Sequence, residues 1–188
     1  MGRWEPDARG RLAKAALELY AEHGYEQTTV AEIAKRAGLT ERTFFRHYAD
    51  KREVLFAGAG DLEALIVRAV ADAPEASVPL DALSAGLDAA AEMFVDRREF
   101  ARRRHAVITE NPELQERELI KLASMAAALA ATLRDRGVVE PTASLAAEAG
   151  VAVFKVAFEH WIAPGEERTM RQLIQESLAE LKAVASGA

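Results

Sequence analysis

Apolar residues recur every three or four positions along almost the whole chain, which is the spacing that places them on one side of an α-helix. We find no segment with the apolar–polar alternation of a half-buried β-strand. Forty of the 188 residues are alanine, the residue with the highest helix propensity. Half of the residues are apolar, so a chain of this length can also bury a core. The sequence therefore predicts an all-α fold.

Glycine, proline and capping residues divide this pattern into about nine helices. Asp50-Lys51-Arg52-Glu53 is a capping box, from which we expect one long helix to run to Pro74. The expected helices cover residues 6–23, 29–37, 40–48, 51–74, 80–96, 99–110, 113–136, 141–162 and 167–185.

Two short helices near the start of the chain carry clear start and stop signals. Thr29-Val30-Ala31-Glu32 is a capping box, in which the Thr hydroxyl accepts from a backbone N–H and the Glu side chain reaches back. Gly38 ends this helix, and Thr40 caps the next one. Two short helices joined by a glycine turn predict a helix-turn-helix module. Its second helix, about residues 40–48, is then the recognition helix for the DNA major groove.

The two faces of this recognition helix differ in chemistry. Phe44 and Tyr48 are four residues apart and are expected to point into a three-helix core. Phe45 is expected to pack at the edge of the module, as is Tyr25. The opposite face offers polar side chains with no apolar residue between them, namely Arg42, Thr43, Arg46 and His47. Arg can contact guanine edges, and Thr and His can contact phosphates. The alternative is an ordinary solvated basic face.

Charge is distributed unevenly along the chain. Residues 1–56 carry ten Lys/Arg and nine Asp/Glu, a net charge of +1, and the remaining residues carry fourteen and twenty-one, a net charge of −7. This asymmetry favours a nucleic-acid-facing end joined to a more acidic body. The helix starts at Thr29, Thr40 and Lys51 would add backbone N–H groups that suit phosphate oxygens.

Between Arg11 and Phe56 the sequence resembles the TetR family of transcriptional regulators. The resemblance is carried by Gly24-Tyr25, Thr28-Thr29-Val30, Ile33-Ala34, Ala37-Gly38-Leu39-Thr40 and Thr43-Phe44-Phe45-Arg46-His47-Tyr48, followed by Lys51 and Leu55. It implies a homodimer, with a DNA-binding domain over residues 1–56 and a helical ligand-binding and dimerisation domain over residues 57–188.

The resemblance also implies roles for individual residues. Residues that match positions of phosphate-backbone contact are Thr29, Thr43, Phe45, His47 and Lys51. Base readout varies among members at the positions matched by Glu41, Arg42 and Arg46. Position 45 is commonly Tyr in the family, and Phe45 has no hydroxyl to offer a phosphate.

The effector site is predicted from residue type. Bulky, adaptable side chains line most small-molecule pockets, and we expect Met93, Phe94, Phe100, Met125, Phe154 and Phe158 around a cavity, with Arg104 beside them. Arg104 belongs to an arginine-rich stretch that also contains Arg97, Arg98, Arg102 and Arg103. From this stretch through Asn111-Pro112 to Trp161, the pattern is similar to family members with acyl-CoA-like ligand-binding domains, and a CoA phosphate would suit the arginines. Alternatively, the arginines pair on the surface with Asp96, Glu99 and Glu110.

The 141–162 segment is apolar on more than one side, so it must be covered twice. Together with the amphipathic 167–185 segment it predicts a four-helix dimer seam, although any one of these apolar residues can simply be core.

Several classes of protein are excluded or disfavoured. The chain has no cysteine, and its four histidines lack ligand spacing, so we expect no metal and no cofactor. No catalytic motif is present, and no apolar run approaches the length of a membrane span. Residues 1–6 lack the apolar stretch of a signal peptide, and we expect a cytoplasmic protein.

The sequence thus predicts a ligand-responsive repressor that a small apolar or acyl-type effector releases from a palindromic operator. A DNA-binding dimer whose helical body is a protein-interaction or assembly module, without an effector, is the alternative.

Overall fold

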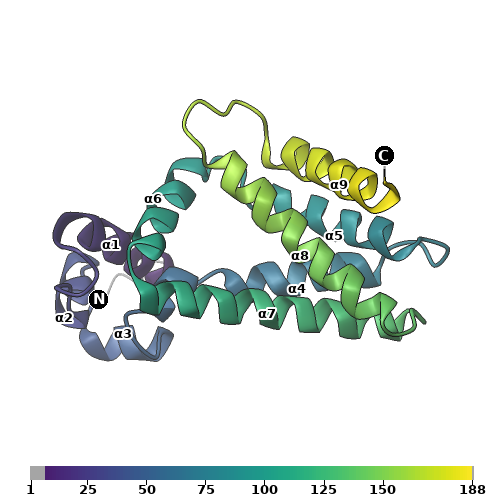
Figure 1. The fold of residues 1–188 in the computed structure, drawn as a ribbon. Helices are drawn as coiled ribbons and strands as arrows, with labels where there is room; N and C mark the ends of the chain where they lie inside the picture. Colours follow the sequence, from purple (N-terminus) through teal and green to yellow (C-terminus); the bar gives the residue numbers. More distant parts are fainter. Residues whose placement is uncertain (1–6, 188) are drawn as a thin grey trace. The chain divides into compact units, whose positions relative to one another are not determined.

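The computed structural model describes residues 7–187. Within these residues it contains α-helices, one short 3-10 helix and no β-strand, which confirms the predicted all-α fold (Figure 1). Residues 1–6, on which the argument against a signal peptide depends, lie outside the described residues. The helices are α1 Ala8–His23, α2 Val30–Arg36, α3 Glu41–His47, η1 (the 3-10 helix) Glu53–Phe56, α4 Ala59–Ala71, α5 Pro79–Glu92, α6 Arg98–Thr109, α7 Pro112–Asp135, α8 Thr142–Trp161 and α9 Met170–Ser186.

The predicted long helix from Lys51 to Pro74 is wrong at its start. The chain forms η1 over Glu53–Phe56, and α4 begins only at Ala59. Val54, Leu55 and Phe56 are all buried. Gly58, which favours neither helix nor strand, lies between the two elements.

The chain divides into two compact units. The first combines the residues up to Gly58 with Arg103–Glu118, and the second combines Ala59–Arg102 with the residues from Leu119 onward. Helices α6 and α7 therefore each contribute residues to both units.

In the first unit, α1, α2 and α3 surround a small core. Leu12, Ile33 and Phe44 are completely buried. Two buried tyrosines tie distant segments of this unit together, since the Tyr20 hydroxyl donates to the Lys51 carbonyl at 2.7 Å and the Tyr48 hydroxyl donates to the Arg9 carbonyl at 3.0 Å.

The segment Arg103–Glu118 is fastened to the η1 region of the same unit by charged side chains. Arg104 Nε donates to the Leu55 carbonyl at 2.6 Å, and Arg104 Nη1 pairs with Glu118 at 3.1 Å. The guanidinium also lies over the Phe56 ring, 5.0 Å from its centroid. Burial lowers the pKa of Arg104, an effect that Glu118 opposes. Two more ion pairs join the same segments, Arg52–Glu113 at 3.0 Å and Arg117–Glu53 at 2.5 Å.

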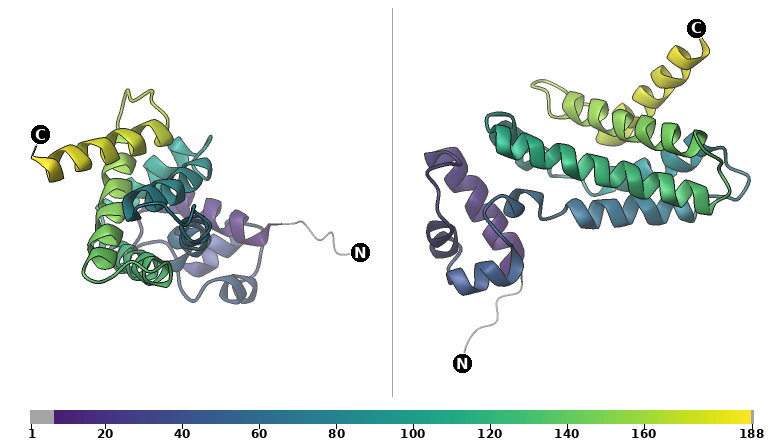
Figure 2. Two further views of the ribbon diagram at one scale, coloured as in Figure 1. Left: turned by 90° about the vertical axis from the view of Figure 1, so that its right-hand side faces the viewer. Right: turned by 60° about the horizontal axis from the view of Figure 1, so that its bottom comes forward.

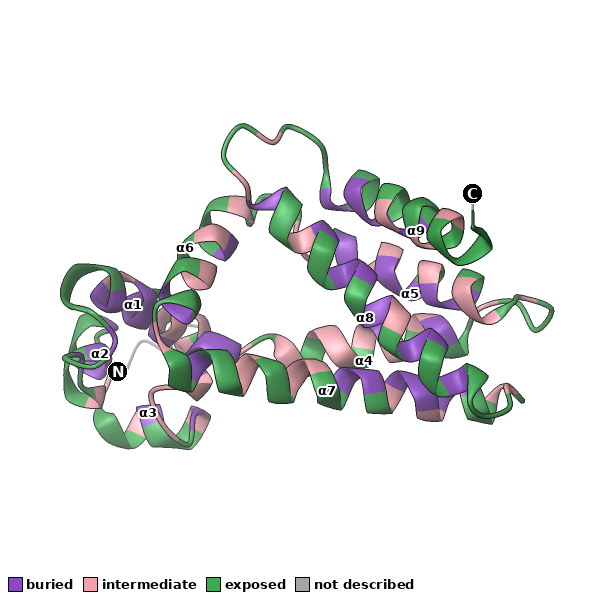
Figure 3. Ribbon diagram, viewed as in Figure 1, coloured by how far each residue is buried: buried purple, intermediate pink, exposed green. Residues whose placement is uncertain are grey.

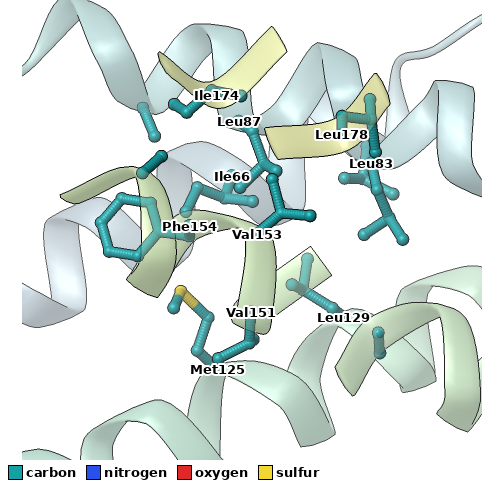
Figure 4. Close-up of a cluster of buried hydrophobic side chains, with 14 of the residues drawn as sticks. Ile66, Leu83, Leu87, Met125, Leu129, Val151, Val153, Phe154, Ile174 and Leu178 are labelled. Carbon is teal, nitrogen blue, oxygen red and sulfur yellow. The ribbon is translucent and has the colours of Figure 1, made fainter. Parts of the chain in front are cut away.

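The second unit is a helical bundle with a larger apolar core. Ile66, Leu83, Leu87, Leu129 and Ile174 come from α4, α5, α7 and α9 and meet in this core (Figure 4). Helix α9 packs against both α5 and α8, as the views in Figure 2 show. A Cβ atom on Gly86 of α5 would lie 2.7 Å from a methyl group of Val70, so glycine is needed for the close approach of α4 and α5.

Candidate nucleic-acid interface

The two short helices of the first unit begin as the sequence predicts. Thr29 caps α2 by accepting from the Glu32 N–H at 3.3 Å, and Glu32 accepts from the Thr29 N–H at 2.8 Å, so the capping box is confirmed. These hydrogen bonds from Thr29 hold the pKa of the Glu32 carboxyl below its usual value. Thr40 caps α3 by accepting from the Thr43 N–H at 3.2 Å. Both helices therefore have fixed start points.

Arg42 and Arg46 are both exposed and lie one turn apart on α3. Figure 3 shows exposed positions along α3. Neither arginine has a hydrogen bond or an ion pair with any residue between 7 and 187. Together with Thr43 and Phe45 they line a surface hollow of about 450 Å³. Their guanidinium groups are therefore available to an external partner, as the predicted base readout requires.

The sequence gives two expectations for Phe45, which are packing at the edge of the module and, by the family resemblance, a DNA contact. Its side chain is 55% exposed and lines the hollow, which agrees better with the second expectation. The DNA contact itself stays a prediction. The expectation that no apolar residue interrupts the polar face is wrong. Arg42, Phe45 and Arg46 stand at positions i, i+3 and i+4, which share one side of a helix.

Lys51 is already engaged within the first unit. Its ammonium group donates to the carbonyls of Tyr25, Glu26 and Thr28 at 2.9, 3.1 and 3.2 Å. It also lies 4.4 Å from the centroid of the Tyr25 ring, a buried side chain. An ammonium group has three protons, so all of its donors are used. The structure thus gives Lys51 a positioning role for the α1–α2 loop, and its phosphate contact stays a prediction.

The threonine hydroxyls differ in what they can still donate. The Thr29 hydroxyl donates to Glu32 at 2.8 Å, so its only proton is used within the cap. The hydroxyls of Thr40 and Thr43 are 3.0 Å apart, and one of them donates to the other. One hydroxyl proton of this pair is therefore not used by the bond between them.

The other two residues predicted at this surface occupy different environments. Glu41 is exposed in the first turn of α3, where a carboxylate suits the positive end of the helix dipole. His47 is half-buried, and its Nε2 atom is buried without a hydrogen-bond partner in the described part of the chain. A phosphate contact by His47 from this position would have to use Nδ1.

Most of the predicted effector residues gather in the second unit. Phe94 contacts Phe154 and Phe158, with ring centroids 5.9 and 5.8 Å apart. Trp161, which was not among the predicted effector residues, lies 5.5 Å from Phe94. Met125 belongs to the same buried core, and Met93 ends α5 beside Phe94. These rings form an aromatic cluster from two distant parts of the chain, and their role toward a ligand stays a prediction.

Two predicted effector residues are not part of this aromatic cluster, although Phe100 belongs to the second unit. Phe100 is 43% exposed on α6, and Arg104 belongs to the first unit, where it is bound to Leu55 and Glu118.

Arg98 and Arg102 of α6 bind the loop after α8. Arg98 lies over the Trp161 ring at 5.3 Å and donates to the carbonyls of Glu166 and Arg168. Arg102 donates to the carbonyls of Ile162 and Ala163 at 2.7 and 3.3 Å and also pairs with Glu99. Cations are favourable beside the free carbonyls at a helix C-terminus. The sequence suggested anion binding or surface pairing, but the main contacts of both side chains are with backbone carbonyls.

Helix α8 is apolar on two sides. Val153, Phe154 and Ala157 are buried, whereas Leu145 and Val156 are 66% and 44% exposed. Ala149 and Ala152 lie between these two at helical spacing, so they form an outward apolar stripe.

Two kinds of feature are absent from the described residues. Between residues 7 and 187 there is no group of three or more His, Cys, Asp or Glu side chains that could hold a metal ion. No helix in that range combines the length and hydropathy that a membrane span requires.

Two family models match the chain. The model described as bacterial regulatory proteins of the tetR family matches residues 12–57. The model described as the MftR C-terminal domain matches residues 77–186, which is more than half of the chain.

Similar proteins are regulators by name. MftR of Mycobacterium tuberculosis, a candidate mycofactocin biosynthesis transcriptional regulator, is 28% identical over 168 residues, covering 86% of this chain and 83% of MftR. The HTH-type transcriptional regulator TcmR of Streptomyces glaucescens is 40% identical over 76 residues, covering 40% of this chain but only 34% of TcmR. Among solved structures, the TetR-family repressor FadR of Thermus thermophilus, in complex with lauroyl-CoA, has a TM-score of 0.55 at 23% identity and covers 93% of each chain. This last likeness shows a shared fold.

Proposed function

Because the chain belongs to the TetR family of bacterial transcriptional regulators, we propose that it is a ligand-responsive repressor. A homodimer binds a palindromic operator through the two copies of α3, and a small apolar or acyl-type effector in the second unit releases it. One observation carries this proposal: Arg42 and Arg46 are exposed on a capped second helix and have no partner among residues 7–187. The proposal includes no catalytic step, metal or cofactor, and it places the protein in the cytoplasm, where bacterial DNA lies.

The outward stripe of α8 supports the homodimer. Leu145, Ala149, Ala152 and Val156 offer an apolar surface that another copy of α8 can cover. In a twofold dimer the same surface meets itself, so one stripe is sufficient for a symmetric seam. Helix α9 packs on α8 and adds the second helix of each subunit to a four-helix arrangement.

The aromatic cluster supports an effector with an apolar part. Phe94, Phe154 and Phe158 form a surface that suits an acyl chain. FadR of Thermus thermophilus, which shares the fold, binds lauroyl-CoA. Arg98 and Arg102 already bind backbone carbonyls, so they support the loop after α8 more directly than they support a CoA phosphate.

Helices α6 and α7 provide a route between effector and operator, because each belongs to both units. In the first unit, α6 and α7 are bound by the η1 region. An effector that binds in the second unit and stabilises one arrangement of α6 and α7 would therefore act on these same two helices. Thermodynamic linkage then requires that effector and operator weaken each other by the same factor.

The test begins with selection of operator duplexes from a random pool by the purified protein. Lauroyl-CoA is then titrated into the complex, with coenzyme A alone and lauric acid as controls. We expect lauroyl-CoA to weaken operator binding by about 5- to 150-fold, the usual range of coupling between sites. In the Phe158→Ala variant we expect operator affinity without effector to be unchanged. The weakening of operator binding by lauroyl-CoA should be smaller than in the wild type. An operator affinity that no acyl-CoA chain length changes would contradict an acyl-type effector.

One observation favours the alternative of an interaction module. Leu119 and Ile120 of α7 are 61% and 50% exposed and adjacent in sequence. If they form a partner-binding surface, the Leu119→Ser/Ile120→Ser double variant will change the mass of the assembly in solution. An unchanged mass together with an acyl-CoA response favours the repressor.

A further inference from the structure

Phe45 is an exposed ring in the middle of a polar DNA-facing surface. It is 55% exposed and shares its hollow with two cations, Arg42 and Arg46, and with Thr43. Phenylalanine has no hydrogen-bonding group, so this side chain cannot donate to a phosphate or to a base edge. Its contribution to DNA binding must therefore be an apolar contact.

The ring has a firm support beneath it. Phe44 is completely buried, and its ring meets the Phe45 ring edge to face, with centroids 5.4 Å apart and planes at 81°. Edge-to-face pairs are a favoured arrangement of aromatic rings. Phe45 is therefore presented outward from a fixed base.

The DNA major groove offers one apolar group to such a ring. Base edges there carry hydrogen-bond donors and acceptors, except that thymine also presents its C5 methyl group. If an aromatic ring on a recognition helix buries apolar surface against base edges, it must contact this methyl group. The only equivalent is the methyl group of 5-methylcytosine.

Arg42 limits where the methyl group lies. Arg42 and Phe45 are three residues apart on one helix face, close to one turn of about 5.4 Å. Base pairs are stacked about 3.4 Å apart along each strand. Two side chains one turn apart therefore reach base pairs that are one or two steps apart.

We propose that Phe45 reads the 5-methyl group of a thymine in each operator half-site, one or two base-pair steps from the guanine that Arg42 contacts. This assignment rests on the proposed operator binding and adds to it the identity of a base. Phe45 then determines specificity, while Arg42 and Arg46 supply the charged contacts.

The test replaces single thymines by uracil, which removes only the C5 methyl group. In a selected operator, each thymine of one half-site is replaced in turn, and affinity is measured without effector for the wild-type protein and for Phe45→Ala. We expect one thymine whose replacement weakens wild-type binding about fourfold per half-site, the effect of burying one methyl-sized group. Phe45→Ala should bind the thymine and uracil duplexes equally.

Two further variants make the result specific to the ring. Phe45→Leu keeps an apolar group and should retain part of the methyl effect. Val139→Ala truncates a side chain that is 72% exposed outside the recognition helix, and it should show the full wild-type effect. If Phe45→Ala binds too weakly to measure, wild-type binding to cytosine and 5-methylcytosine at the same position is compared, and the methylated base should bind more tightly.

Three results would overturn the assignment. The first is a half-site in which no thymine methyl group affects wild-type binding. The second is a methyl effect that persists in Phe45→Ala. The third is uniform weakening of all duplexes by Phe45→Ala, which would place the ring against the sugar-phosphate backbone. A selection that enriches no sequence would instead contradict operator binding itself, so the two failures are distinguishable.

Discussion

The arginines of α3 and those of α6 differ in what already occupies them. Arg42 and Arg46 on α3 have no partner among the described residues, whereas Arg98, Arg102 and Arg104 on α6 all donate to backbone carbonyls. In the sequence the α6 arginines form the denser cluster, for which both anion binding and surface pairing were open. The comparison teaches that the availability of a cation for a ligand depends on nearby unpaired carbonyls, which tertiary structure supplies.

Loss of Arg104 should have the largest effect on stability. Arg104→Ala leaves Glu118 and the Leu55 carbonyl without their partner in a largely buried place. We expect the free energy of unfolding to fall by about 3 kcal/mol, measured by urea denaturation. The matched Arg42→Ala variant should change it by less than about 0.5 kcal/mol. Equal losses in the two variants would erase the distinction between the two sets of arginines.

Arg42 should show the reverse behaviour in DNA binding. Arg42→Ala is expected to weaken the selected operator by about 2 kcal/mol and to relax preference at one base pair, because a bidentate contact to guanine is lost. Titration against operators altered at each position would measure this. A uniform loss across all positions would indicate a phosphate contact and contradict base readout.

A Lys51 variant tests whether a cation that is already hydrogen-bonded within the protein also contacts DNA. Lys51→Met removes three hydrogen bonds that hold the α1–α2 loop, and we expect a loss of about 1 kcal/mol or more in stability. If its donors stay on these carbonyls, the slope of log affinity against log salt concentration will not change. A fall of about 0.9 in that slope would show that Lys51 neutralises a phosphate in the complex.

The smallest effect concerns the loop that Arg98 binds. Hydrogen bonds from Arg168 lower the pKa of Glu166 from 4.5 to about 2. A carboxyl whose pKa is lower in the folded state stabilises the protein above its unfolded pKa, and this contribution is lost as the pH falls toward the folded value. Between pH 5 and pH 2, Glu166→Gln should therefore lose less stability than the wild type. Urea unfolding across this range measures the difference, and identical pH profiles would contradict it.

Local features were predictable from the sequence because they involve near neighbours. The Thr29–Glu32 capping box and the Thr40 cap each join residues three apart, and both are confirmed. Edge packing was expected for Phe45 from its apolar character, whereas its match to a DNA-contact position agrees with its exposure. The i, i+3, i+4 relation with Arg42 and Arg46 was available in the sequence and indicates exposure.

Features that join distant segments were less predictable. Phe94 and Phe158 were predicted as effector residues from residue type alone. Trp161 joins them in the aromatic cluster because of how α5 packs against α8, which the sequence does not show. The helical pattern also did not show the break between η1, which ends at Phe56, and α4, which begins at Ala59. The engagement of Arg104 depends on a carbonyl 49 residues away in sequence.

The inclusion of Arg103–Glu118 in the first unit has a consequence for recombination among related genes. Val107, Ile108 and Leu114 of this segment are 7%, 0% and 0% exposed. A single crossover near codon 58 would join an N-terminal module from one parent to a 103–118 segment from another, with mismatched apolar surfaces and ion pairs. Viable hybrids would have to inherit both pieces from the same parent, so we expect natural exchange of operator specificity to proceed by substitutions within α3 more often than by module transfer.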